Sequence, residues 1–280
     1  MKKIILLLLL SFAWQANAAQ YSALYILGDS LSDTGNNKFP ASDWRYWHGH
    51  YSNGQMWPEI LSSYLGFAYS QANNKAFGGA ATFDQAGYPG ASTQLSQLPA
   101  TIPSNAVCVV WLGTNDLQYV FYRYLLGLTG ATNLYYQIAG QAMQNISNTV
   151  GVLYARGARK IVVLNAYDVT LTTDYNEQNG NYWPHFVLFY FSLATTDFNN
   201  RLANTVASLR TRYHGLSLPL IDARGKLNAV TGLKTSRGWD DPLFLSTHDY
   251  RIGDAYRTWD GLHPTSKLDG MIALWIYGVL

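Results

Sequence analysis

The chain has 280 residues, of which 48% are hydrophobic, 15% aromatic and only 13% charged, with 19 basic against 17 acidic residues. This near balance, without any basic block, argues against a nucleic-acid-binding protein. The single cysteine, Cys108, excludes a disulfide within the chain, and its apolar neighbours predict a buried thiol rather than a nucleophile.

Residues 1–18 have the pattern of a cleavable signal peptide. Two lysines precede a short apolar run, and Ala16-Asn17-Ala18 fits a cleavage site with small residues. The run is shorter than the roughly 20 residues that a membrane-spanning helix needs, although an uncleaved N-terminal anchor stays open as the alternative. Cleavage removes two of the 19 basic residues and leaves 17 against 17 acidic ones. We expect export to the periplasm, the outer membrane or the medium, and one domain over residues 19–280.

The rest of the chain alternates between two patterns. Short apolar runs rich in β-branched residues predict buried parallel strands over residues 22–27, 106–112, 160–165 and 218–221. Helical periodicity predicts helices over residues 57–65, 133–156, 186–212 and 266–277. Repeated strand and helix predict an α/β fold whose parallel sheet is covered on both faces. The polar, aromatic segments 38–51 and 172–184 are expected to be loops near the active edge.

Ser30 is the candidate nucleophile. It lies in Gly28-Asp-Ser-Leu-Ser32, directly after the first predicted strand, and therefore at the sheet edge where open α/β folds place their chemistry. A serine hydroxyl is a poor nucleophile unless a base accepts its proton. A serine that caps the start of a helix is the structural alternative.

Asp260 and His263 are the candidate orienting acid and base. They are three residues apart in Asp-Gly-Leu-His-Pro, a spacing that puts two side chains on the same side of a turn. The carboxylate can then hold the imidazole in one tautomer and stabilise the imidazolium. The other five histidines are expected to be structural. His48-x-His50 has no second group of ligands nearby, so we expect neither a metal nor another cofactor.

Two further segments provide candidate donors for an oxyanion. Gly113-Thr-Asn-Asp116 follows the strand over 106–112, so Asn115 is expected at the same sheet edge as Ser30. Gly79, in a glycine pair, can expose a backbone N–H that no side chain covers. Each segment taken alone is ordinary turn chemistry, and only the combination indicates a catalytic site.

Four blocks, around Ser30, Gly79, Asn115 and His263, follow one another between residues 28 and 264. Together they resemble the blocks of the GDSL esterase/lipase family, also called SGNH hydrolases. The G-x-S-x-G elbow of other α/β-hydrolases is missing at Ser30. The resemblance implies a flavodoxin-like, three-layer α/β/α domain. It also implies that Ser30 is the nucleophile, His263 the general base and then acid, and Asp260 its orienter. The implied oxyanion hole consists of the N–H groups of Ser30 and Gly79 and the side-chain amide of Asn115.

Within the family, the motif around Ser30 is most similar to bacterial exported phospholipases, lysophospholipases and haemolysins. We therefore expect a secreted carboxylic-ester hydrolase that acts on acyl lipids, with phospholipid or lysophospholipid as substrate. The aromatic, weakly charged composition suits peripheral contact with a membrane surface. An acetyl esterase acting on carbohydrate, a lipid acyltransferase, and a non-catalytic binding module that keeps the fold are the alternatives.

Overall fold

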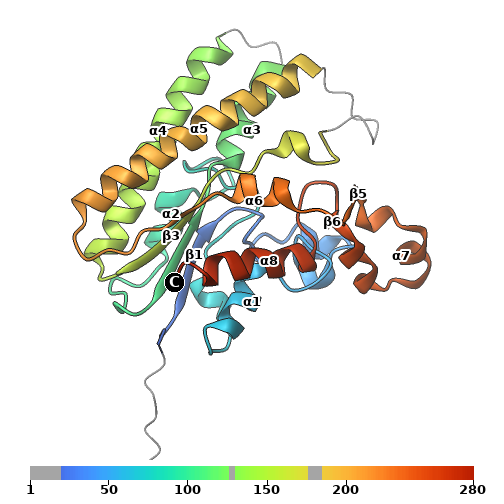
Figure 1. Ribbon diagram of the computed structural model, residues 1–280, viewed down its shortest axis with the longest axis horizontal. Helices are drawn as coiled ribbons and strands as arrows, with labels where there is room; N and C mark the ends of the chain where they lie inside the picture. Colours follow the sequence, from blue (N-terminus) through green and yellow to red (C-terminus); the bar gives the residue numbers. More distant parts are fainter. Residues whose placement is uncertain (1–19, 126–129, 176–184) are drawn as a thin grey trace, which may run out of the picture.

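The computed structural model describes residues 20–125, 130–175 and 185–280. Its centre is a parallel sheet with helices on both sides (Figure 1). The signal-peptide prediction for residues 1–18 lies outside the described residues, as does most of the predicted loop over 172–184.

Four strands form the main sheet in the described part of the chain. They run in parallel, in the order β1 (Leu24–Gly28), β2 (Val107–Trp111), β3 (Lys160–Leu164) and β4 (Leu220–Ile221). The segment after Asn74 lies along the other edge of β1, where Asn74 forms a parallel bridge with Ile26. The N–H of Lys75 donates to the carbonyl of Ile26, and that of Phe77 to the carbonyl of Gly28. With this segment included, the order is that of a flavodoxin-like sheet whose second strand is reduced to a bridge.

The strands are buried on both faces, which explains their continuous apolar sequences. Ile26 and Val109 belong to the cluster that packs against α1 (Trp57–Tyr64), α6 (Ala223–Ala229) and α8 (Ser266–Tyr277). Leu27 and Val110 belong to the cluster on the other face, which packs against α2 (Ala91–Ser96), α4 (Ala131–Ala155) and α5 (His185–Arg212). Cys108 is fully buried in this second cluster, and burial raises the pKa of its thiol to about 12. The prediction of an inert core cysteine is confirmed.

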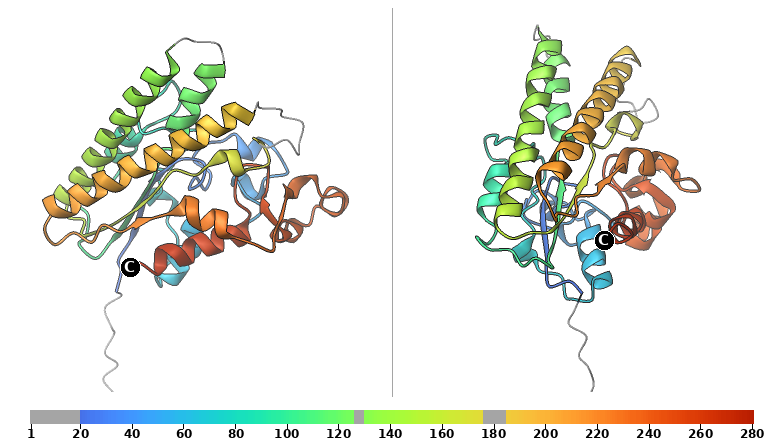
Figure 2. Two further views of the ribbon diagram at one scale, coloured as in Figure 1. Left: turned by 45° about the horizontal axis from the view of Figure 1, so that its top comes forward. Right: turned by 60° about the vertical axis from the view of Figure 1, so that its left-hand side comes forward.

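The helix α3 (Thr114–Leu125) replaces what the sequence pattern predicts as a turn. Gly113, with φ of 130°, ends the connection from β2, and the helix begins at the next residue. The residues that follow are rich in aromatic side chains, which have weak helix propensity, so the sequence gives little indication of a helix. Figure 2 shows α3 and the first turns of α4 and α5 projecting beyond the sheet.

A smaller lobe follows α6. It contains the two-stranded sheet of β5 (Lys234–Arg237) and β6 (Tyr256–Thr258) and the short helix α7 (Pro242–Thr247). Residues 38–51 form the expected irregular segment, with two single 3-10 turns. This segment shares an apolar cluster with the lobe, in which Tyr46, Tyr51 and Met56 meet Phe244 and Trp259. Among the described residues, no helix is both long and apolar enough to cross a membrane.

Candidate active site

Ser30 lies in a tight turn that immediately follows β1. The side-chain amide of Gln94, on α2, pairs with both backbone groups of Gly28: it accepts from the N–H at 2.9 Å and donates to the carbonyl at 2.8 Å. The carboxylate of Asp29 then accepts the N–H of Leu31 at 3.0 Å. Ser30 is half-buried, whereas Ser32 is completely buried. Of the two serines in the motif, only Ser30 is accessible to a substrate.

The glycine pair is attached to the Ser30 loop through Asp33. One carboxylate oxygen of Asp33 accepts the N–H of Gly78 at 2.8 Å, and the carboxylate also accepts backbone N–H groups from residues 35–37. Gly79 has φ of 85°, and a Cβ atom there would lie 2.7 Å from the ring of Tyr88. A Cβ at Gly78 would lie 2.2 Å from the hydroxyl of Tyr51. Gly79 therefore requires glycine for its backbone conformation, and a side chain at Gly78 would displace Tyr51.

Two backbone donors of the expected oxyanion hole are available. Among the described residues, neither the N–H of Ser30 nor that of Gly79 donates a hydrogen bond to another protein group. The flanking N–H groups of Gly78 and Ala80 are both occupied. An unpaired N–H at the rim of a site is a donor that a developing negative charge can use.

Asn115 lies in the first turn of α3, next to both segments. Its amide nitrogen is 3.3 Å from a carboxylate oxygen of Asp29 and 3.1 Å from the carbonyl oxygen of Ala80. The next residue, Asp116, accepts both the N–H and the hydroxyl of Thr82. The start of α3 thus joins the residue before Ser30 to the residue after Gly79, and it brings the first three sequence blocks together.

Asp260 and His263 form a hydrogen-bonded pair in the loop between β6 and α8. The N–H groups of Leu262 and His263 donate to Oδ1 of Asp260, at 2.9 Å and 2.7 Å. Its Oδ2 is 2.5 Å from Nδ1 of His263. Gly261, with φ of 98°, allows this tight turn. Because Nδ1 faces a carboxylate, it carries the proton, and Nε2 is left as the basic nitrogen.

The packing of Tyr51 places His263 beside the glycine pair that Asp33 connects to the Ser30 loop. The ring of Tyr51 packs on the imidazole with 4.7 Å between centroids, and its hydroxyl lies against Gly78. The charges of Asp29 and His263 also affect each other's pKa. Within the described part of the chain, no hydrogen bond joins the Ser30 hydroxyl to His263. Catalytic hydrogen bonds are often long in a free enzyme and tighten when substrate binds.

The acidic and basic groups of the site have shifted pKa values. Burial would raise the pKa of Asp260, but His263 and the hydrogen bonds that the carboxylate accepts lower it to about 2. Burial would lower the pKa of His263, but the carboxylate of Asp260 outweighs it and raises this pKa above the ordinary value. Asp29 behaves oppositely to Asp260, since burial raises its pKa to about 7 against opposing contacts from Leu31 and Asn115. Asp260 is therefore the permanent anion of the site.

The α3–α4–α5 projection contains a separate cavity of about 560 Å³. Leu117, Phe121 and Tyr124 line it from α3, and the first turns of α4 and α5 close its other sides. Those α3 positions lie roughly 180° to 240° around the helix from Asn115 at 3.6 residues per turn. The cavity therefore lies behind the catalytic face of α3 and does not belong to the site.

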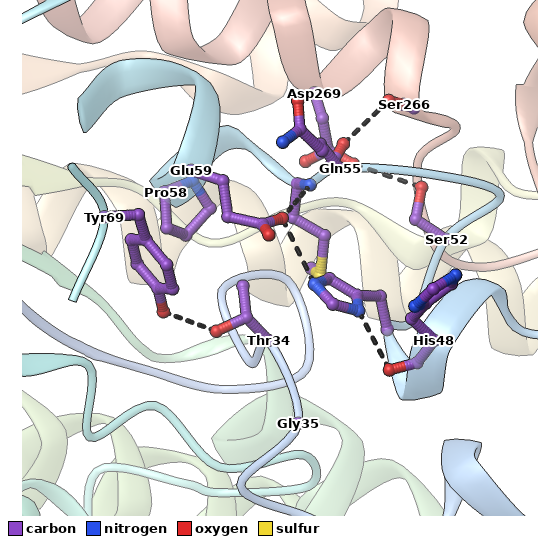
Figure 3. Close-up of polar contacts among 12 residues, drawn as sticks. Thr34, Gly35, His48, Ser52, Gln55, Pro58, Glu59, Tyr69, Ser266 and Asp269 are labelled. Carbon is purple, nitrogen blue, oxygen red and sulfur yellow. Dashed lines mark hydrogen bonds and ion pairs between the residues drawn. The ribbon is translucent and has the colours of Figure 1, made fainter. Parts of the chain in front are cut away.

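His50, for which the sequence predicts a structural role, connects the segment 38–51 to the start of α1. Its Nε2 is 3.1 Å from a carboxylate oxygen of Glu59 at the start of α1, and its Nδ1 faces the carbonyl of His48 (Figure 3). No group of three or more His, Cys, Asp or Glu side chains within residues 20–125, 130–175 and 185–280 is arranged to hold a metal ion.

Sequence reasoning missed Asp29, Tyr46 and Tyr51 as members of the site. Asp29 is part of the recognised motif, but its contact with Asn115 joins residues 86 positions apart. Tyr46 and Tyr51 come from the segment 38–51, whose aromatic, irregular sequence places it near the site without indicating which side chains contact the pair.

The chain is similar to several known proteins. A GDSL esterase/lipase of Arabidopsis thaliana is 24% identical over 89% of this chain and 86% of its own length. The thermolabile hemolysin of Vibrio parahaemolyticus is 35% identical, over 38% of this chain and 28% of its own. The lipase Lip_vut3 from a goat rumen metagenome shares the fold, with a TM-score of 0.51 and 14% identity over 92% of this chain and 97% of its own. The profile of the GDSL-like lipase/acylhydrolase family matches residues 24–276, a range that includes Ser30, Gly79, Asn115, Asp260 and His263, and the chain belongs to this family of ester-hydrolysing lipases and esterases.

Proposed function

We propose that the chain is an exported serine esterase that cleaves carboxylic esters of acyl lipids, with phospholipid or lysophospholipid as substrate. The observation that carries the mechanism is the buried pair of Asp260 and His263, joined at 2.5 Å and packed through Tyr51 against Gly78, whose N–H donates to Asp33 in the segment that follows Ser30. Export is supported by the signal-peptide pattern of residues 1–18.

In the proposed mechanism, Oγ of Ser30 attacks the ester carbonyl carbon while its proton passes to Nε2 of His263. The carbonyl oxygen becomes an oxyanion that the N–H groups of Ser30 and Gly79 and the amide of Asn115 stabilise. The bond to the alcohol then breaks, and His263 returns the proton to the leaving oxygen. Water attacks the acyl-enzyme in the same way, with His263 as base, and releases the carboxylic acid. Asp260 stays ionised throughout, since its pKa is about 2.

For Asn115 to act in this way, its amide has to exchange one of its present acceptors for the oxyanion. The contact with Asp29 is the longer of the two, at 3.3 Å against 3.1 Å for the carbonyl of Ala80. Burial raises the pKa of Asp29 to about 7, so near neutral pH its carboxyl competes for the amide less strongly than a fully ionised carboxylate does. We infer that substrate binding releases the amide from Asp29.

The substrate class is tested with protein purified from the exported fraction, whose first residue after cleavage is expected to be Ala19. Nitrophenyl esters from acetyl to palmitoyl measure the chain-length preference, and mass spectrometry of vesicles of phosphatidylcholine or its lyso form measures fatty-acid release. We expect faster cleavage of longer acyl chains and release of free fatty acid. Strict preference for acetyl would indicate a carbohydrate deacetylase instead. Transfer of the acyl group to an added alcohol, in place of hydrolysis, would indicate an acyltransferase.

An exposed apolar stripe on α5 supports contact with a lipid surface. Phe186, Phe189, Tyr190 and Leu193 follow the spacing of one helix face, and their side chains are 55%, 60%, 63% and 49% exposed. Aromatic side chains of this kind favour the boundary between water and lipid. These residues lie in the first turns of α5, at the end of the helix that projects beyond the sheet (Figure 2).

Replacing Phe186 and Phe189 together by serine is expected to weaken binding to phosphatidylcholine vesicles about tenfold or more, because two large apolar side chains no longer enter the lipid. Cosedimentation with vesicles measures the effect. Cleavage of a soluble nitrophenyl ester should not change. The matched control replaces Leu274 and Tyr277 by serine on α8, where these residues are similarly exposed, at 54% and 46%. An equal loss of binding in both variants would contradict a docking role for the stripe.

A further inference from the structure

Tyr46 makes a direct hydrogen bond to the proposed catalytic pair. Its hydroxyl donates to Oδ2 of Asp260 at 2.7 Å, and the same oxygen accepts from Nδ1 of His263. Tyr46 and Asp260 are only 6% and 5% exposed, so water cannot easily replace the bond. With the two backbone donors on Oδ1, the carboxylate accepts four hydrogen bonds.

We propose that Tyr46 is a positioning residue of the active site, which fixes the carboxylate of Asp260 and thereby sets the orientation and proton affinity of His263. This inference rests on the proposed function. A hydrogen bond to Oδ2 withdraws negative charge from the oxygen that faces the imidazole. It therefore weakens the preference of His263 for its protonated form, and it keeps more of the base neutral near pH 7.

Packing fixes the position of the Tyr46 hydroxyl. The Tyr46 ring meets the rings of Tyr51 and Trp239 edge to face, with centroid distances of 5.8 Å and 5.5 Å. The guanidinium of Arg45 lies 3.9 Å from the Trp239 ring, and the carbonyl of Arg45 accepts the indole N–H of Trp259 at 2.8 Å. Trp259 directly precedes Asp260, so the backbones on both sides of the hydrogen bond are tied to each other.

The same segment holds the rest of the His263 loop. Tyr51 packs on the imidazole, and the hydroxyl of Ser52 donates to the carbonyl of Pro264 at 2.9 Å and lies 3.3 Å from the carboxylate of Asp269. Figure 3 shows the contact between Ser52 and Asp269. Beside it is Ser266, whose hydroxyl donates to the carbonyl of Gln55. Residues 46–55 thus bind the loop from Asp260 to Ser266 at several points. The hydrogen bond from Tyr46 is the one that reaches the proposed catalytic carboxylate.

The titratable and charged groups around His263 come from several elements. The groups that face it are Asp260 on its own loop, Asp29 after β1, Asp174 after β3, and the phenols Tyr46 and Tyr51. Asp174 is itself paired with Arg237 on β5. Among the described residues, only Asp260 is hydrogen-bonded to the imidazole, so a change in its hydrogen bonds is expected to affect His263 more than a change at the other groups.

The test is Tyr46→Phe, which keeps the packed ring and removes the hydroxyl. We expect kcat/KM for a soluble ester to fall about tenfold, since one hydrogen bond to a charged group is worth about that factor, with little change in KM. We expect the acidic limb of the pH profile to move upward by about half a unit, because Oδ2 becomes more basic and the pKa of His263 rises further. The matched control is Tyr135→Phe, whose hydroxyl donates to Asp197 at the same 2.7 Å, away from the site.

NMR titration of the His263 ring separates this proposal from the proposed function, because it needs no turnover. A higher His263 pKa in Tyr46→Phe than in the wild type supports the positioning role even if no ester is cleaved. An unchanged His263 pKa and pH profile overturns it, even if the wild type is an active esterase. Should Tyr46→Phe not fold, 3-fluorotyrosine at position 46 provides the second test. Its more acidic hydroxyl is a stronger donor, so the pKa of His263 is expected to fall, and an unchanged or raised pKa contradicts the proposal.

Discussion

Ser30→Ala is expected to abolish ester cleavage, lowering kcat by roughly four to six orders of magnitude while leaving the fold intact. The change removes one oxygen atom from a half-buried side chain in a turn that Asp29 and Gln94 already hold. No described hydrogen bond of the fold is lost with it. Initial rates on a nitrophenyl ester and covalent labelling by a fluorophosphonate measure the loss, and thermal unfolding confirms that the protein is folded.

Ser32→Ala is the matched control, since it makes the same change two residues away. The Ser32 side chain is completely buried, and its hydroxyl has no hydrogen-bond partner among the described residues. Removal of such a hydroxyl should be neutral or slightly stabilising, and activity should be retained. Full activity in Ser30→Ala, or loss of labelling in Ser32→Ala with a folded protein, would contradict Ser30 as nucleophile.

His263→Ala should resemble Ser30→Ala, because the proposed mechanism uses both residues in the same proton transfer. The double variant is therefore expected to lose no more activity than either single variant. Additive losses would mean that the two residues act independently, and this would contradict a shared step. His48→Ala is the control: His48 is exposed, its ring packs on Trp47, and its backbone carbonyl, which the substitution keeps, faces Nδ1 of His50.

Asn115→Ala is expected to lower kcat by about a hundredfold to a thousandfold, the usual effect of removing one oxyanion donor. KM should change less, because the amide acts mainly on charge that develops in the transition state. The variant should still react with a fluorophosphonate, but slowly, because Ser30 and His263 are intact. Stopped-flow or initial-rate kinetics on a soluble ester, with labelling rates measured alongside, distinguish this pattern from that of Ser30→Ala.

Asn145→Ala is the matched control for this prediction. Its amide donates to the carbonyl of Thr82 at 3.2 Å, much as that of Asn115 donates to the carbonyl of Ala80 at 3.1 Å. The stability lost with one such hydrogen bond should therefore be similar in both variants. If Asn115→Ala keeps kcat within about threefold of the control, the amide is not an oxyanion donor.

Local sequence patterns were sufficient for the main elements of the fold. The four strands match the predicted runs, and α1, α4, α5 and α8 begin and end within two residues of the predicted helices. Strands buried on both faces and long amphipathic helices carry strong local signals. Short or aromatic elements do not, which is why α2 and α3 were not predicted.

For the site, the sequence by itself determined which residues are the candidates, because Ser30, Gly79, Asn115, Asp260 and His263 lie in motifs with recognisable composition and order. Only the tertiary structure decided how these residues are held. The amide of Asn115 is shared between Asp29 and Ala80, and Asp260 accepts a hydrogen bond from Tyr46, 214 residues away. The physical reason is that motifs reflect local backbone geometry, whereas a buried hydrogen bond between distant segments depends on how the whole core packs.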